Sequence, residues 1–231
     1  MNSIYNSWLI DFELKQFRDL LYVLSNSLKD FERKLEDWYT ADELDNMDDE
    51  QQDQYERYID IYGSVLGDFP RRIYSAFLVS WYSFVEDALE HLCMDLNLTV
   101  SIRFQEQEKL GSGILRAKRF LSETGHIEIV KEDWLELDFI RRIRNQIVHD
   151  GGKFPRSLDR PDNNAQTILI KEEETSYHVT IDNALYEYLE LHSLHHFYGT
   201  LIVNPSLEYC QHLVSFGQRF FSKILSDLKL I

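Results

Sequence analysis

The spacing of hydrophobic residues along the chain predicts a protein built mainly from long helices. In the N-terminal part, apolar side chains recur at steps of three and four, which predicts a helix over residues 8–39. A polar stretch follows, and the same period resumes over residues 55–66, which predicts a second helix and an antiparallel hairpin. Only four prolines and nine glycines interrupt the chain, and this scarcity favours long helices throughout.

The remaining pattern predicts more helices and one small sheet. Asp68-Phe69-Pro70 has the form of a helix start, because proline fits the first helical turn, and the apolar period then continues to about Leu96. Two short runs of β-branched and aromatic residues around the charged turn EEETS predict a β-hairpin. The further elements expected are helices at 112–121, at 132–148 with Gly151-Gly152 at its end, at 184–196 and from 204 onwards, and hairpin strands at 167–171 and 177–181.

These elements define a mainly α fold, a helical bundle with an N-terminal helical hairpin and a small β-hairpin insertion. We expect an acidic helical hairpin at residues 1–66 and a helical domain at residues 67–231, with the β-hairpin near 166–182, or else one continuous domain. No apolar run approaches the about 20 residues that cross a bilayer, and the N-terminus lacks the features of a signal peptide. Two distant cysteines, Cys93 and Cys210, fit reduced thiols. We therefore expect a cytoplasmic protein without a membrane anchor.

The charge of the chain is strongly negative but unevenly distributed. Lys and Arg total 24 and Asp and Glu total 40, a net of −16. Residues 30–60 hold 13 acids and three bases, whereas residues 101–160 hold twelve bases and ten acids. The total excludes a broad coat for nucleic acid, because phosphate is repelled over most of the surface, but it permits a small basic cleft. The acidic segment is either a solvated helix face or a surface that binds a partner or mimics nucleic acid.

The stretch with the clearest chemistry is Arg144-Asn145-x-x-x-His149 at the end of an amphipathic helix. On a helical wheel, Arg144 falls inside the apolar arc rather than on the solvated face. A guanidinium in that position is costly unless it is paired or functional. Glu86, at the margin of the apolar arc of the preceding long helix, is the expected partner. Two interpretations follow: a structural Arg144–Glu86 ion pair with His149 capping its helix, or a catalytic Arg and His that Glu86 orients.

These residues resemble the R-x(4–6)-H motif of HEPN domains, in which the residue after the Arg is typically polar and often Asn. The preceding helix, SAFLVSWYSFVEDALEHLC at residues 75–93, resembles the aromatic-rich helix of that family that carries a Glu. The resemblance covers about residues 70–228. HEPN toxins paired with minimal nucleotidyltransferases often carry a Tyr two positions after the His, and here that position is Gly151. This departure puts nucleotidylylation-type control in doubt and leaves the Arg–His pair intact.

The resemblance implies a metal-independent endoribonuclease that uses no cofactor and cleaves RNA through the RNA's own 2′-hydroxyl. An imidazole can act as acid or base near neutral pH, so His149 would move protons. Arg144 would hold the phosphate, Asn145 would orient the phosphate or the His, and Glu86 would orient the pair. The RNA-binding residues expected around this centre are Arg116, Arg119, Arg141 and Arg142.

The resemblance also implies partners and a biological role. HEPN ribonucleases are typically homodimers whose motifs line one cleft. Each chain has one His149, so a symmetric dimer supplies two of these side chains. We expect a toxin of a toxin–antitoxin pair or an antiviral, abortive-infection effector, with an antitoxin or another defence-system protein as partner. The alternatives are a non-catalytic helical interaction module and a nucleotide-sensing HEPN module.

Three histidines near residue 195 are the remaining candidates for chemistry. His192 and His196 have the i, i+4 spacing that places two ligands on one helix face, and His195 lies between them. No further ligand is recognisable by motif, so we expect packed or exposed histidines and no metal site.

Overall fold

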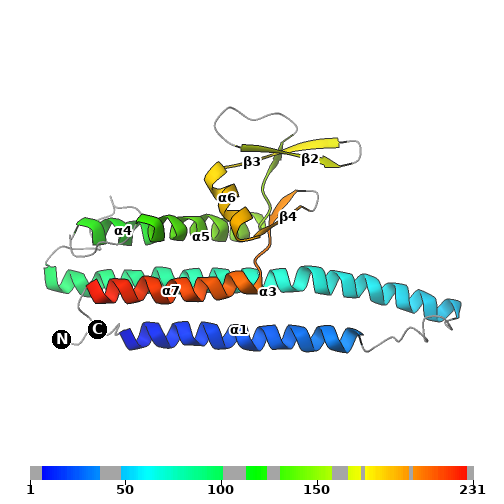
Figure 1. The fold of residues 1–231 in the computed structure, drawn as a ribbon, viewed down its shortest axis with the longest axis horizontal. Coiled ribbons are helices and arrows are strands. Elements are labelled where there is room, and N and C mark those ends of the chain that lie inside the picture. Colours follow the sequence, from blue (N-terminus) through cyan, green and yellow to red (C-terminus); the bar gives the residue numbers. More distant parts are fainter. Residues whose placement is uncertain are drawn as a thin grey trace.

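Long helices lie side by side, and a small β region stands on one side of them (Figure 1). This confirms the mainly α fold with a small β insertion. The described helices of the computed structural model are α1 (Ser7–Glu36), α3 (Asp49–Val100), α4 (Gly113–Glu123), α5 (Lys131–Asp150), α6 (Asn183–Leu191) and α7 (Leu207–Asp227). The structure describes residues 7–36, 48–100, 113–123, 131–157, 166–172, 175–197 and 200–227.

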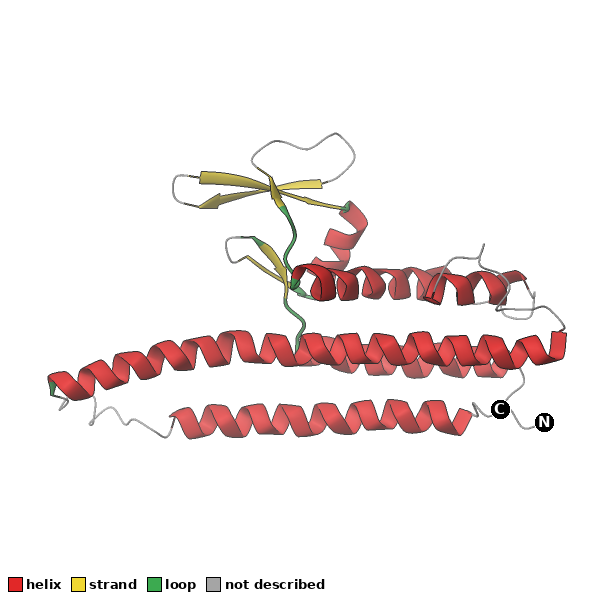
Figure 2. Cartoon of the chain, turned by 180° about the vertical axis from the view of Figure 1, so that it is seen from behind, coloured by secondary structure: helices red, strands yellow, loops and turns green. Residues whose placement is uncertain are grey.

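The helices form layers around one hydrophobic core. α1 lies along α7 and α3, and α4 and α5 cover the opposite side of α3 (Figures 1 and 2). Leu14 of α1, Trp81 of α3 and Phe216 of α7 are fully buried where the three helices meet. Gly217 permits this approach, because a Cβ there would lie 3.0 Å from Leu14 Cδ2 and 3.2 Å from Trp81 Cζ2. The N-terminal helix therefore shares its core with the rest of the molecule.

α3 is a single helix of 52 residues where the sequence predicts two. The helix start predicted at Asp68-Phe69-Pro70 is wrong, because Pro70 lies inside the helix and only deprives one turn of its i→i−4 hydrogen bond. Ion pairs span that turn, from Arg71 and Arg72 to Asp68 at 3.4 and 4.0 Å. The domain boundary expected between residues 66 and 67 thus falls within α3.

A capping box starts α3 earlier than the apolar period predicts. Asp48 Oδ1 accepts from the Gln51 backbone N–H at 2.9 Å, and Gln51 Oε1 accepts from the Asp48 backbone N–H at 3.0 Å. This reciprocal pair satisfies two backbone donors at the helix start. The polar residues after Asp48 are therefore helical although they have no apolar stripe.

The predicted β-hairpin is confirmed and gains a third strand. β2 (Gln166–Glu172) and β3 (Thr175–Ile181) pair antiparallel, with Ile168 opposite Val179. β1 (Arg156–Ser157) pairs with the other edge of β3, and it lies outside the two strands predicted at 167–171 and 177–181. The sheet order is therefore β1-β3-β2.

The helix predicted at residues 184–196 is wrong after Leu191. Ser193 takes a positive φ of 52°, and the chain then forms β4 (His195–Phe197), which pairs antiparallel with β5 (Leu201–Val203). The β5 strand also binds the segment after α5, since the Val203 N–H donates to the Gly152 carbonyl at 2.8 Å. α7 then starts at Leu207, three residues after the predicted start at residue 204, and Ser206 Oγ there accepts from the Tyr209 N–H at 3.2 Å.

Among the described helices, none is both long and apolar enough to cross a membrane.

Candidate functional site

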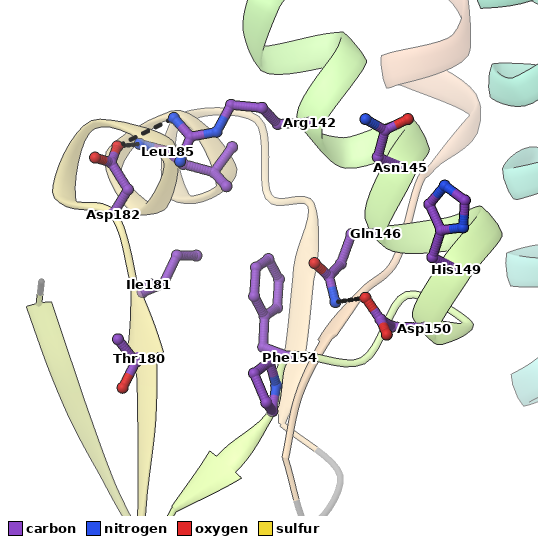
Figure 3. Close-up of a pocket in the computed structure, with 11 residues that line it drawn as sticks. Arg142, Asn145, Gln146, His149, Asp150, Phe154, Thr180, Ile181, Asp182 and Leu185 are labelled. Carbon is purple, nitrogen blue, oxygen red and sulfur yellow. Dashed lines mark hydrogen bonds and ion pairs between the residues drawn. The ribbon is translucent and has the colours of Figure 1, made fainter. Parts of the chain in front are cut away.

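An open pocket of about 400 Å³ lies at the C-terminal end of α5 (Figure 3). Its walls come from α5, the segment that follows it, the end of β3 and the start of α6. The floor is apolar and consists of Phe154, Ile181 and Leu185, all of which are buried. The polar residues of the rim include Arg142, Asn145, Gln146, His149, Thr180 and Asp182.

Asn145 and His149 stand together on the pocket side of α5. They are four residues apart, so they lie one above the other on the same helix face (Figure 3). Asn145 is half-buried and His149 is exposed. α5 ends directly beyond them, where the Gly152 N–H donates to the Gln146 carbonyl at 2.9 Å. The imidazole is therefore accessible from the pocket and from solvent.

Arg144 does not line this pocket and is directed toward α3. Its Cζ lies 5.7 Å from the ring centroid of Tyr82, in a cation–π contact. Its Nη1 donates to Asn145 Oδ1 at 3.0 Å. Its Nε is buried and has no hydrogen-bond partner in the described part of the chain. The prediction from the helical wheel is correct in placing Arg144 off the solvated face, and the residues that it contacts are an aromatic ring and an amide.

Glu86 lies one turn beyond Tyr82 on α3 but does not pair with Arg144. Its carboxylate lies against the start of α4, so closely that a Cβ on Gly113 would be 1.8 Å from Glu86 Oε1. Within the described residues, no ion pair joins Glu86 to Arg144. The interpretation as a structural Arg144–Glu86 ion pair is therefore wrong, and the catalytic interpretation loses the same contact, since it has Glu86 orient Arg144. A carboxylate is favoured at a helix N-terminus, which explains the position that Glu86 takes.

The environment of Tyr82 keeps its hydroxyl protonated. Burial first, and then the nearby Glu86 carboxylate, raises the pKa of Tyr82 far above its usual range, against smaller opposite effects of Arg141 and Arg144. The ring beneath the guanidinium of Arg144 is thus a neutral aromatic face at physiological pH.

Arg142 is the RNA-binding candidate that reaches the pocket. Its Nη1 donates to Asp182 Oδ1 at 3.2 Å, from the opposite wall. The same Asp182 oxygen accepts from the Leu185 backbone N–H at 3.0 Å and so caps α6. That backbone bond, followed by Arg142, lowers the pKa of the Asp182 carboxyl. Both side chains are partly exposed, so this ion pair is open to a competing ligand.

The other three RNA-binding candidates lie outside the pocket lining. Arg141 donates from Nε and Nη2 to Asp138 Oδ1, at 3.0 and 2.8 Å. Arg116 pairs with Glu90 at 2.6 Å, and Arg119 lies on the exposed side of α4. The structure therefore does not gather the four arginines into one groove within the chain.

The histidines considered as metal ligands belong to different elements. His192 follows the end of α6, whereas His195 and His196 lie on β4. His192 and His196 therefore do not lie on the one helix face that the i, i+4 spacing predicts. The described residues contain no group of three His, Cys, Asp or Glu side chains that could hold a metal ion.

His192 instead joins a polar cluster between α5, α6 and α7. Its ring centroid lies 4.8 Å from that of His212 and 4.5 Å from that of Tyr188. His212 Nε2 lies 2.5 Å from Glu136 Oε1. Burial, and then the neighbouring His212, lowers the pKa of His192. No motif in the sequence marks this cluster, because its members come from three separate elements.

Of the eleven residues that line the pocket, only Arg142, Asn145 and His149 are predicted from the sequence as site residues. Asp182 and Asn183 are both residue types that favour an N-cap and both precede the helix predicted from residue 184, and this signal could have identified Asp182 as a residue at the start of α6. No local signal identifies Phe154 as the floor of a pocket.

Comparisons of the chain with protein-family models, with curated proteins and with solved structures found no match. The resemblance to HEPN domains therefore stays a prediction.

Proposed function

We propose that the protein is a metal-independent endoribonuclease of the HEPN type that cleaves RNA by attack of a 2′-hydroxyl on the adjacent phosphorus. One observation carries the proposal: Asn145 and His149 share the rim of an open pocket, and Arg144 is bonded to that same Asn145. The motif residues thus form one connected unit at the end of α5.

The reaction requires two proton transfers. The 2′-oxygen loses its proton as it bonds to phosphorus, and the departing 5′-oxygen takes up a proton as its bond to phosphorus breaks. The products are a 2′,3′-cyclic phosphate and a 5′-hydroxyl, and no water or metal enters the balance. Neutral imidazole accepts the first proton and imidazolium donates the second, so we propose that a homodimer contributes two His149 side chains to one cleft.

Arg142 supports phosphate binding at the same pocket. Its ion pair with Asp182 is partly exposed, so an RNA phosphate competes with the carboxylate for the guanidinium. The net charge of −16 limits the contact to a short length of RNA. We place the activity in the cytoplasm, in a toxin or antiviral effector that an antitoxin or another defence-system protein controls.

Cleavage of single-stranded RNA in EDTA tests the proposal. Wild type should release fragments that end in a 2′,3′-cyclic phosphate, and His149→Ala should cleave at least about 100-fold more slowly, because general acid–base catalysis contributes about 10²–10⁴-fold. His196→Ala is the matched control, since His196 is an exposed histidine on β4 outside the pocket. Equal cleavage by wild type and His149→Ala would contradict the proposal, as would a wild type that cleaves none of a diverse RNA set.

A nucleotide-sensing module is the second candidate function. The apolar floor of the pocket and the guanidinium of Arg142 at its rim fit a base and a phosphate. Calorimetry with the four ribonucleoside monophosphates distinguishes this function, because a sensor binds a nucleotide stoichiometrically and leaves RNA intact.

A further inference from the structure

The Asn145 amide has a fixed orientation because Arg144 holds one end of it. The guanidinium can only donate hydrogen bonds, so the atom that receives Nη1 at 3.0 Å must be the amide oxygen. In Figure 3 the amide nitrogen of Asn145 lies on the side of Arg142, and the oxygen lies on the opposite side. The two N–H donors of Asn145 are therefore presented to the pocket.

Arg144 is itself held away from the pocket. One face of its guanidinium lies over the buried Tyr82 ring, Nη1 is used by Asn145, and Nε is buried. A ligand in the pocket meets Asn145, His149 and Arg142, all of which line it, and does not meet Arg144.

We propose that Asn145 is the residue of the motif that contacts the bound phosphate, together with His149 and Arg142, and that Arg144 is a positioning residue that acts through Asn145. This inference rests on the proposed function for its substrate. A hydrogen bond from a charged donor polarises the amide, so the Nδ2 protons of Asn145 become better donors to an anion. The positive charge of Arg144 thus strengthens the hydrogen bonds that the Asn145 amide donates to the phosphate.

Neutral and apolar replacements of Arg144 separate the two roles. Arg144→Gln keeps a neutral donor that can hold Asn145 Oδ1, and Arg144→Met has the length of glutamine and makes apolar contacts but has no donor. We expect kcat of Arg144→Gln to stay within about 10-fold of wild type, and kcat of Arg144→Met to fall about 100-fold or more. Asn145→Asp keeps the size and the bond to Arg144 but presents a carboxylate, so KM should rise and kcat should fall. Direct contact of Arg144 with phosphate would instead make Arg144→Gln as inactive as Arg144→Met and leave Asn145→Asp active.

A titration of the wild-type protein with inorganic phosphate tests the inference without RNA cleavage. The side-chain amide signal of Asn145 in ¹H–¹⁵N spectra should shift with phosphate more than the Nε–H signal of Arg144. A larger shift at Arg144, or no shift at Asn145 where His149 responds, would overturn the assignment. If RNA stays intact with every variant, the ribonuclease proposal fails, and this titration still decides which side chain meets the anion.

Discussion

Gly113 shows how one residue determines the position of Glu86. Its φ is +54°, and its missing Cβ is the space that the Glu86 carboxylate occupies. The carboxylate lies at the positive end of the α4 dipole, and Arg144 stacks on Tyr82. The glycine at the start of α4 thus leaves the room that the Glu86 side chain takes up there.

Gly113→Ala should lower the free energy of unfolding by about 1–3 kcal/mol. A left-handed φ costs a non-glycine residue about 1–2 kcal/mol, and the Glu86 carboxylate must also move away from the α4 N-terminus, which loses up to about 1 kcal/mol of its interaction with the helix dipole. Gly151→Ala is the control, because φ there is +61° and a Cβ would meet nothing within 4 Å. Urea unfolding followed by circular dichroism should therefore show, for Gly151→Ala, only the loss of stability that the left-handed φ causes. Equal losses in the two variants would mean that the carboxylate does not press on residue 113.

At the scale of elements, α6 is a short helix held at both ends. Its N-cap Asp182 pairs with Arg142 of α5, and His192 at its C-terminal end packs in the cluster with α7. Because α6 also forms one wall of the pocket, the stability of this attachment affects the geometry of the site.

Acid should loosen the C-terminal attachment of α6. His192 faces Tyr188 of its own helix, Tyr209 and His212 of α7 and, beyond His212, Glu136 of α5. Its folded pKa lies below the ordinary value of 6.5, so the unfolded chain takes up the proton first as pH falls. The contribution of neutral His192 to stability is therefore present above pH 6.5 and is lost as pH falls below it through the folded pKa.

Hydrogen exchange of the α6 amides checks this expectation between about pH 7.5 and about pH 5, after correction for the intrinsic effect of pH on exchange. Exchange should rise in wild type on acidification and should rise less in His192→Gln, which has no titratable ring. His196→Gln should behave as wild type, since His196 is exposed on β4. An equal rise in wild type and in His192→Gln would exclude His192 as the cause.

At the scale of the whole molecule, the sequence predicts elements better than contacts between them. Hydrophobic periodicity and turn residues are local properties of the sequence. The helices α1 and α5 and the β2–β3 hairpin are therefore predicted nearly as they occur. The Arg142–Asp182 pair joins residues 40 apart, and only the packing of α6 on α5 creates it. The same limit explains Arg144, whose apolar surroundings are predicted from the wheel but whose contact with Tyr82 depends on how α3 lies against α5.

Pro70 is the clearest case in which packing overrides a local rule. Proline inside a helix costs about 3 kcal/mol relative to alanine, and this preference predicts a helix start rather than a continuous α3. The helix nevertheless continues on both sides, and from Tyr74 onward its residues enter the shared core. Burial of that face of α3 offsets the cost of one missing hydrogen bond.

Pro70→Ala should consequently raise the free energy of unfolding by about 2 kcal/mol. Alanine regains about 3 kcal/mol of helical stability, less up to about 1 kcal/mol because the unfolded chain gains conformational freedom. Pro205→Ala is the matched control, since Pro205 is buried just before α7 and outside any helix, and it should give no gain. Urea unfolding with circular dichroism at 222 nm measures both variants. A stability of Pro70→Ala equal to or below that of wild type would show that α3 is not one helix through residue 70 and would restore the predicted break between the N-terminal hairpin and the rest of the molecule.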